Sequence, residues 1–312
     1  MDAGNTVVSK KPVPEEMPET KAIWLKALLS LVLYIGIYYF LFQQKIKWIL
    51  LLVVVMIIHE AGHFIAMKYF KYKDVQLLFV PFLGAFVSGR PGIISQRQRT
   101  ITLLAGPLPG IITGILLFVI FKYNQQIFYY HLSLMFVLLN IFNLLPVSPL
   151  DGGQLIENLF SGINRIIQPI FLAASGIALF YFALITHNYF ILLIVWLIIT
   201  RLRAQIMQNR IYNDLDKSSV PYNKSYEALS DEEYMNIRKC IIRRVPSLKS
   251  YDEDVISDDE GPVMEYVQKL LKGTAKNDMT LQYKIVVIAV WIIFTVFPII
   301  MYVLCTPGYH IF

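Results

Sequence analysis

The chain has 312 residues, of which 56% are hydrophobic and 16% are charged, and its formal net charge is +6. An ordinary soluble domain is about 45–50% apolar and about 25% charged, so this composition argues against a soluble enzyme and favours an integral membrane protein. The basic residues gather in polar stretches between apolar runs, and no basic groove with interleaved aromatic residues stands out. We therefore expect no nucleic-acid partner and take the basic residues as a signal of membrane orientation.

About 20 apolar residues are needed to cross the hydrocarbon core of a bilayer as a helix. The first 22 residues form a polar tail, and the spanning helices predicted after it lie at 23–42, 48–70, 100–121, 127–145, two within 166–199, and 285–304. Lys and Arg are concentrated between the second and third spans and after the sixth. This bias predicts that the N-terminus and the even-numbered loops are cytoplasmic. The fold class we expect is an all-α integral membrane protein, a polytopic helical bundle of about seven spans.

Residues 75–89 are apolar, but they are too short and too rich in Gly and Pro for a spanning helix. Val, Phe and Leu on both sides of Pro81 and Gly84 favour two extended strands joined by a bend. Because unpaired backbone cannot face lipid, such a hairpin must lie against protein or in a cavity. We expect a short membrane-associated β-hairpin, with 77–80 as a candidate edge strand for an extended peptide. A re-entrant loop that only packs is the alternative.

The longest polar segment, 203–282, is long enough to fold separately. Its sequence Ser230-Asp231-Glu232-Glu233 has the pattern of a capping box that opens a helix. Pro262 and Gly273 suit the start and the end of a second helix. We therefore expect four parts, namely a polar N-terminal tail (1–22), a membrane core (23–202), a small helical cytosolic module (203–282) and a C-terminal transmembrane span with its tail (283–312).

The second span contains His59-Glu60-Ala61-Gly62-His63, which is an HExxH motif. Residues four apart share one helical face, so His59 and His63 can bind one metal ion, and Glu60 can hold a water molecule and take its proton. Zinc lowers the pKa of a bound water to about 7, which supplies the nucleophile that peptide hydrolysis needs. Ionisable residues inside a span cost about 2.5–3.5 kcal/mol each and are usually functional. We prefer this interpretation to a polar cluster that merely faces the bundle interior.

A catalytic zinc site usually has three protein ligands and one open position, so a third ligand must come from elsewhere. After the fourth span, residues 143–153 read NLLPVSPLDGG. The prolines end the helix, and Asp151 follows in an apolar setting, where it can supply a carboxylate. A simple Asp-Gly turn is the alternative. His131 and His187 lie near predicted membrane boundaries, where polar residues are common, and are weaker candidates.

The HExxH motif, together with NxxPxxxxDG at 143–152, resembles the site-2 protease family of intramembrane zinc metalloproteases, and the resemblance covers roughly residues 48–155. It implies one zinc ion per chain, bound by His59, His63 and Asp151, with Glu60 activating water. It also implies that Asn143 binds the substrate backbone or the oxyanion. Residues 105–107 resemble a small-residue turn of the family, although the polar residue that usually follows is absent here.

The resemblance implies a zinc-dependent intramembrane endopeptidase that hydrolyses peptide bonds in transmembrane or membrane-adjacent segments of protein substrates. The lipid bilayer would be a bacterial inner membrane, with the N-terminus and the 203–282 module in the cytoplasm. The alternative is a non-proteolytic zinc-binding membrane protein, either a pseudoprotease or a metal transporter. Against it, the catalytic base Glu60 is present, and the metal-binding residues gather at one site rather than along a route.

Overall fold

The computed structural model describes residues 10–12, 23–42, 46–80, 84–90, 94–160, 165–187, 189, 191–257, 259–271 and 278–305. The chain divides into two compact units. The first, which we call the helical module, combines Met1–Pro18 with Leu193–Lys276, and the second, which we call the membrane core, combines Glu19–Leu192 with Asn277–Phe312. The N-terminal tail therefore groups with the module rather than with the first helix.

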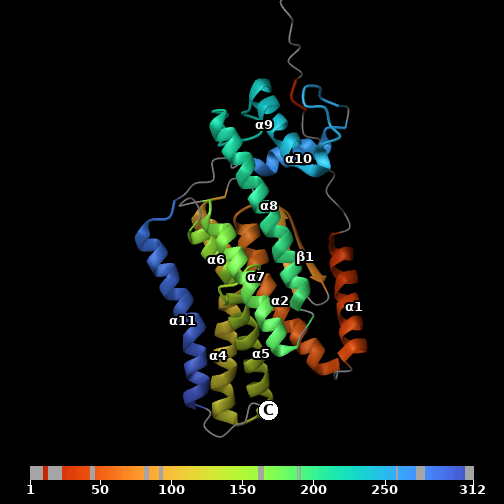
Figure 1. The fold of residues 1–312 in the computed structure, drawn as a ribbon. Coiled ribbons are helices and arrows are strands. Elements are labelled where there is room, and N and C mark those ends of the chain that lie inside the picture. The colour runs from red at the N-terminus through yellow and green to blue at the C-terminus, as the bar shows by residue number, and fades with distance from the viewer. Residues whose placement is uncertain are drawn as a thin grey trace, which may run out of the picture. The chain divides into compact units, whose positions relative to one another are not determined.

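The membrane core is a bundle of apolar helices with one small sheet (Figure 1). Its helices are α1 (Ile23–Phe42), α2 (Ile46–Tyr69), α3 (Gln96–Ala105), α4 (Pro107–Asn124), α5 (Ile127–Leu144), α6 (Asp151–Leu159), α7 (Ile167–Thr186) and α11 (Leu281–Cys305). A further helix, α8 (Ile191–Lys217), begins at the end of the core and continues into the module. This architecture confirms the predicted helical membrane fold.

Six segments among the described residues are long and apolar enough to cross a membrane, and Leu25–Phe40 within α1 adds a shorter apolar stretch. The predicted third span is two helices, α3 and α4, which meet at Gly106. Pro107 causes this break because it has no N–H to donate to the preceding turn. The sixth span also differs from the prediction, since α8 continues well past residue 199 to Lys217. It continues because Ile211 and Leu215 are fully buried in the core of the module.

The predicted hairpin is confirmed as an antiparallel pair of strands, β1 (Lys73–Val80) and β2 (Gly84–Arg90). Its bend, 81–83, lies outside the described residues. Leu77 faces Val87 across the pair. Helix α1 lies alongside β1 (Figure 1), and the Phe79 N–H donates to Ser30 Oγ of α1 at 3.1 Å.

The contact between α1 and β1 decides which edge of the hairpin is open. In an antiparallel pair, residues alternate between pointing their N–H toward the partner strand and away from it. Because the Phe79 N–H points to α1, the N–H of Leu77, two residues earlier, also points away from β2 and toward α1. The N–H of its partner Val87 points away from β1, toward the outer edge of β2. The outer edge of β1 therefore lies against α1, and the edge that faces the rest of the core belongs to β2.

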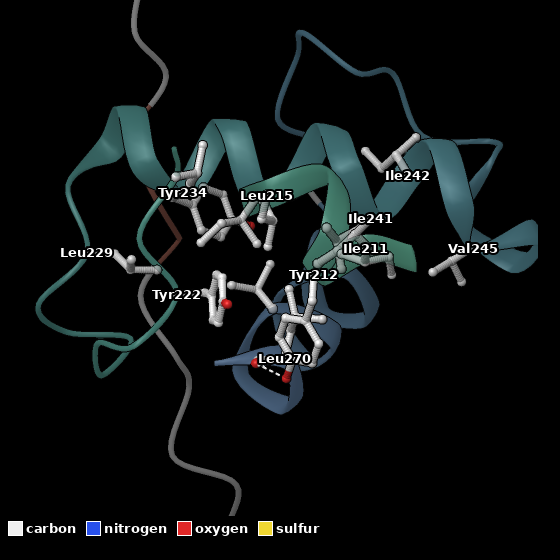
Figure 2. Packing of buried hydrophobic residues seen from close by; sticks show 14 of the residues in the cluster. Ile211, Tyr212, Leu215, Tyr222, Leu229, Tyr234, Ile241, Ile242, Val245 and Leu270 are labelled. Carbon is white, nitrogen blue, oxygen red and sulfur yellow. Dashed lines mark hydrogen bonds between the residues drawn. The ribbon is translucent and has the colours of Figure 1, made fainter. Parts of the chain in front are cut away.

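The helical module contains α9 (Asp231–Arg244), a 3₁₀ turn η1 (Pro246–Leu248) and α10 (Gly261–Leu270). The predicted capping box is present, since Ser230 Oγ accepts from the Glu233 N–H at 3.2 Å and the Glu233 carboxylate accepts from the Ser230 N–H at 2.9 Å. Pro262 occupies the first turn of α10, and Gly273 lies outside the described residues. The end of α8, α9 and α10 share one hydrophobic core, in which the Tyr212 hydroxyl donates to the Leu270 carbonyl at 2.7 Å (Figure 2).

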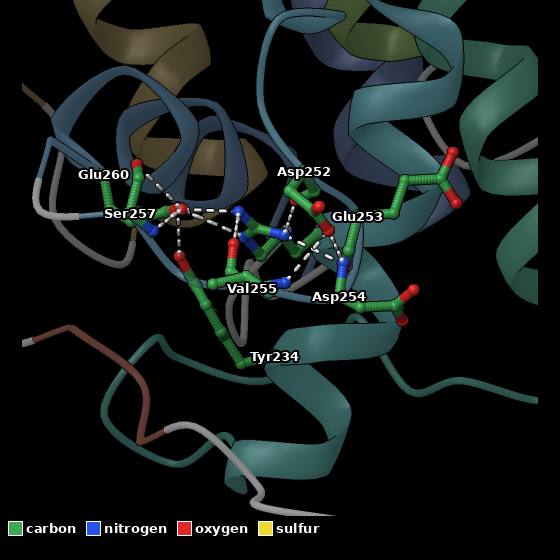
Figure 3. A network of polar contacts seen from close by, with 8 residues as sticks. Tyr234, Asp252, Glu253, Asp254, Val255, Ser257 and Glu260 are labelled. Atoms are coloured by element: carbon green, nitrogen blue, oxygen red, sulfur yellow. Dashed lines mark hydrogen bonds and ion pairs between the residues drawn. The ribbon is translucent and has the colours of Figure 1, made fainter.

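A fully buried arginine fixes the loop between η1 and α10. Arg238 on α9 has 0% of its side chain exposed and forms an ion pair with Glu260, which is 3% exposed. Its guanidinium also donates to the carbonyl oxygens of Asp252, Glu253 and Val255 at 2.5–3.0 Å (Figure 3). Five N–H donors in one planar group satisfy both the carboxylate and the turn, so Arg238 fixes the conformation of this loop, which also packs Tyr251 and Ile256 against the core of the module.

We expect Arg238→Leu to destabilise the helical module by about 3–5 kcal/mol, because it leaves the Glu260 carboxylate buried without its partner. Hydrogen exchange of the α9 and α10 amides in the full-length protein measures this loss. Arg243→Leu is the matched control on the same helix, since the ion pair of Arg243 with Glu253 is exposed and exposed pairs contribute little. Equal acceleration of exchange in both variants would contradict the assignment.

Candidate metal centre

Helix α2 and the start of α6 bring three metal-ligating side chains together. His59 and His63 lie one turn apart on α2, and Asp151 is the first residue of α6. Asp151 Oδ2 is 3.2 Å from His59 Nε2 and 3.1 Å from His63 Nε2, and the two Nε2 atoms are 3.2 Å apart. His59 is 3% exposed and His63 is 7% exposed. The structure therefore brings together, in a buried site, the three residues that the sequence predicts as ligands.

The spacing of the three ligand atoms suits zinc. Zinc–nitrogen and zinc–oxygen bonds are about 2.0–2.2 Å long and tetrahedral, which puts neighbouring ligand atoms about 3.3 Å apart. The observed separations of 3.1–3.2 Å match one face of such a tetrahedron. Three protein ligands of this kind leave a fourth position open, as in catalytic zinc sites. The donor set and its geometry therefore fit a single zinc ion.

The other ring nitrogen of each histidine is bound within the protein. His59 Nδ1 lies 2.7 Å from Asn140 Oδ1, and His63 Nδ1 lies 2.8 Å from the Thr102 carbonyl oxygen. Since both oxygens are acceptors, each Nδ1 carries the proton and donates it, which leaves Nε2 free for a metal ion. The Asn140 amide nitrogen donates to the Phe136 carbonyl at 2.7 Å, so its oxygen is the atom turned to His59.

Two glycines allow the helices to approach the site closely. A Cβ on Gly62 would collide with the carbonyl oxygen of Ala105, at the end of α3. A Cβ on Gly106 would collide with the imidazole ring of His63. The break between α3 and α4 is therefore packed directly against the HExxH turn, and this contact brings the Thr102 carbonyl within reach of His63.

The position of Asp151 depends on the turn between α5 and α6. The last turn of a helix has carbonyl oxygens without partners in the helix, and on α5 the Leu144 carbonyl accepts a hydrogen bond from the Trp291 indole of α11 at 2.8 Å. At the start of α6, the Gln154 amide donates to the Pro149 carbonyl at 2.9 Å. Contacts from the last span and from α6 itself therefore hold the turn that carries the third ligand.

Glu60 lies beside the three ligands and is 7% exposed. Its carboxylate is within hydrogen-bonding reach of the backbone N–H of Val87 on β2. This contact agrees with the strand register, in which the Val87 N–H points outward from β2. The open edge of the hairpin is thus the edge next to Glu60. The sequence predicts 77–80 on β1 as that edge, but α1 lies against it.

The structure gives the two asparagines of α5 different surroundings. Asn143, the asparagine of the NxxPxxxxDG pattern, is partly buried, and its side chain donates to the Leu139 carbonyl within the same helix at 3.1 Å. Its contact with substrate stays a prediction. Asn140, one turn earlier, is fully buried and contacts His59. Sequence reasoning missed Asn140, although a polar amide inside an apolar span was a signal that could have found it.

Comparison with known proteins matches a peptidase family over the part of the chain that holds this site. The family model described as Peptidase family M50 matches residues 47–127 and 122–186. A zinc metalloprotease of Methanocaldococcus jannaschii is 27% identical over 180 residues, which cover 54% of this chain and 52% of the relative. Stage IV sporulation protein FB of Bacillus subtilis is 30% identical over 146 residues, which cover 45% of this chain and 46% of the relative.

Among solved structures, a site-2 protease from Methanocaldococcus jannaschii aligns with a TM-score of 0.42 and 23% identity, covering 58% of this chain and 88% of that chain. The chain spans about half the length of the curated relatives it matches. The matched residues 47–186 include α2, the hairpin and α3 to α7. The family match therefore covers the whole candidate metal centre and ends before the module.

We expect Asn140→Ala to weaken zinc binding about 10- to 100-fold, because the partner that fixes the orientation of a ligating histidine is lost. Zinc titration of the purified protein in detergent measures the effect. Asn143→Ala is the matched control on the same helix, and we expect it to leave zinc affinity near that of the unsubstituted protein. An Asn140→Ala protein that binds zinc normally would show that the contact with His59 does not orient the ligand.

Proposed function

We propose that this protein, whose residues 47–186 match the model of peptidase family M50, is a zinc-dependent intramembrane endopeptidase of the site-2 protease family. The observation that carries the proposal is the convergence of three ligand atoms, 3.1–3.2 Å apart, beside a buried glutamate. They lie among helices long enough to cross a membrane. The substrates we propose are peptide bonds in transmembrane or membrane-adjacent segments of proteins.

We assign zinc binding to His59, His63 and Asp151, one ion per chain. Zinc in this site would polarise the scissile carbonyl and acidify water. Glu60, the second residue of the HExxH motif, is the general base that takes a proton from the attacking water. It then returns that proton to the leaving amine nitrogen. The Val87 N–H, which is within reach of the Glu60 carboxylate, orients this base.

Substrate presentation follows from the open edge of β2. A peptide bond inside a helix has its carbonyl hydrogen-bonded and screened, so a protease needs its substrate extended. An extended peptide can pair with a free strand edge through its backbone, and the outward edge of β2 lies next to Glu60. Because this pairing uses the substrate backbone, it places few constraints on the identity of the substrate's side chains. We keep for Asn143 the proposed role of binding a substrate carbonyl or the oxyanion, which an amide can fill.

The location we propose is a bacterial inner membrane. The concentration of Lys and Arg between the second and third spans and after the sixth supports a cytoplasmic N-terminus and a cytoplasmic helical module. In this orientation α2 ends at the cytoplasmic side, so the metal centre lies inside the membrane and nearer the cytoplasm. Its partners are the lipid bilayer and membrane-protein or peptide substrates.

The first test is Glu60→Gln. Glutamine keeps the shape of the side chain but cannot accept the proton of water, so we expect turnover to fall about 10²- to 10⁴-fold. Zinc content should not change, because Glu60 is not among the three ligands. Cleavage of a transmembrane substrate in proteoliposomes, together with metal analysis of the same preparation, measures both quantities. A metal transporter would tolerate this substitution. Full cleavage activity in Glu60→Gln, or a loss of zinc as large as the loss of activity, would refute the role assigned to Glu60.

The second test compares Val87→Pro with Leu77→Pro. These residues face each other across the hairpin, and their N–H groups point to opposite edges. Proline has no N–H, so Val87→Pro removes a donor from the edge beside Glu60, and Leu77→Pro removes one from the edge beside α1. We expect a loss of turnover with retained zinc only in Val87→Pro, measured by the same cleavage and metal assays. Because the Val87 N–H also contacts Glu60, a loss confined to Val87→Pro supports a role of the β2 edge in the reaction, and equal turnover in the two variants would mean that this edge neither orients Glu60 nor presents the substrate.

A further inference from the structure

The side chain of Lys11, in the N-terminal tail, is bound by backbone of the helical module. Its Nζ donates to the carbonyl oxygens of Tyr226 at 3.0 Å, Glu227 at 2.8 Å and Leu229 at 2.7 Å. The ammonium also lies 5.5 Å from the centre of the Tyr226 ring, within the range of a cation–π contact. Three acceptors for three N–H donors satisfy the charged group completely.

The tail backbone is bound beside the side chain. The Lys11 N–H donates to Asp231 Oδ1 at 3.0 Å, and the Tyr226 hydroxyl donates to the Pro12 carbonyl at 2.7 Å. Burial raises the pKa of Tyr226 to about 12, so this hydroxyl stays protonated and remains a donor. Residues 11 and 12 of the tail are thus held by main-chain and side-chain contacts together.

The loop that binds Lys11 offers these acceptors because of its local conformation. The Ala228 N–H donates to the Ser225 carbonyl at 3.1 Å, and the Leu229 N–H donates to the Tyr226 carbonyl at 3.2 Å. The chain turns twice in this way before α9 begins at Asp231. These turns direct the carbonyls of 226, 227 and 229 to one point, where a cation can be bound.

The geometry selects lysine over arginine. An ammonium group directs its three donors to the corners of a tetrahedron, whereas a guanidinium is planar and suits paired acceptors such as a carboxylate. The neighbouring Lys10 carries the same charge but is exposed. A general attraction between a basic tail and an acidic surface would not distinguish the two lysines, whereas this set of contacts involves only Lys11.

We propose that the loop 226–231 is a lysine-specific peptide-binding site, which the chain's own N-terminal tail occupies through Lys11 and Pro12. The ligand class is an extended peptide with a lysine followed by proline. Through this site residues 10–12 become part of the helical module. The hydrogen bond between Lys11 and Asp231 joins residues that are 220 positions apart in the sequence. This role is separate from the proposed proteolysis, since none of these residues lies in the metal centre.

The test uses the full-length protein in detergent and a fluorescent peptide with the sequence of residues 7–16, VVSKKPVPEE. In a Lys11→Ala protein the tail has lost its ammonium group, so the site is available and the labelled peptide should bind. In the unsubstituted protein and in Lys10→Ala, the tail competes and binding should be weaker. A peptide with alanine in place of Lys11 should bind about 10- to 100-fold more weakly than one with alanine in place of Lys10.

Hydrogen exchange gives an independent measurement on the same proteins without added peptide. Lys11→Ala should accelerate exchange of the amides of 226–231, and Lys10→Ala should not. Lys11→Arg should resemble Lys11→Ala, because the charge is kept and the shape is lost. Equal effects of Lys10→Ala and Lys11→Ala, or peptide binding that does not depend on Lys11, would overturn the proposal. Zinc content measured in parallel shows that the membrane core is intact.

Discussion

The arrangement of the membrane core depends on the need to satisfy ionisable groups that are buried among apolar helices. His59, Glu60 and His63 lie in a largely apolar helix, and the hydrocarbon of a bilayer offers them no hydrogen-bond partner. Each group therefore has a partner from another element. The end of α3 gives a carbonyl to His63, α5 gives an amide to His59, and the hairpin gives a backbone N–H to Glu60. With Asp151 at the start of α6, these partners link the ionisable residues of α2 to four neighbouring elements.

The sequence was sufficient to predict the parts of this arrangement that repeat a local pattern. Long apolar runs predicted the spanning helices, alternation of Gly and Pro with apolar residues predicted the hairpin, and the HExxH spacing predicted two ligands on one face. The chemistry of the second motif predicted Asp151 as the third candidate ligand. In each of these cases the information lies within one continuous stretch of sequence, where hydrophobic patterning or turn chemistry determines the structure.

What could not be predicted depends on contacts between residues far apart in the sequence. Asn140 lies outside the NxxPxxxxDG pattern that marks Asn143, and only the packing of α5 against α2 shows that its amide contacts His59. The hairpin was predicted, but its open edge was assigned to the wrong strand. The contact of α1 with β1 joins residues 49 positions apart, as between Ser30 and Phe79, and no local pattern indicates it. The extension of α8 to Lys217 likewise follows from the burial of Ile211 and Leu215 in the module. The fall in hydropathy after residue 199 marks the end of the apolar run, but it does not mark the end of the helix.

The three carbonyl oxygens that bind Lys11 have a consequence for how such a site can be found in other proteins. These acceptors are main-chain carbonyls, so the exposed side chain at 227 can change without altering the contacts of Lys11, whereas Leu229 is also held by its burial in the core of the module. Evolutionary comparison of the loop alone would then show little constraint from Lys11 at position 227. The constraint should instead appear as correlated presence of the tail lysine, a tyrosine at 226 and an acidic residue at 231. A homologue that lost the tail would be free to lose the tyrosine as well, while its metal-binding residues stayed unchanged.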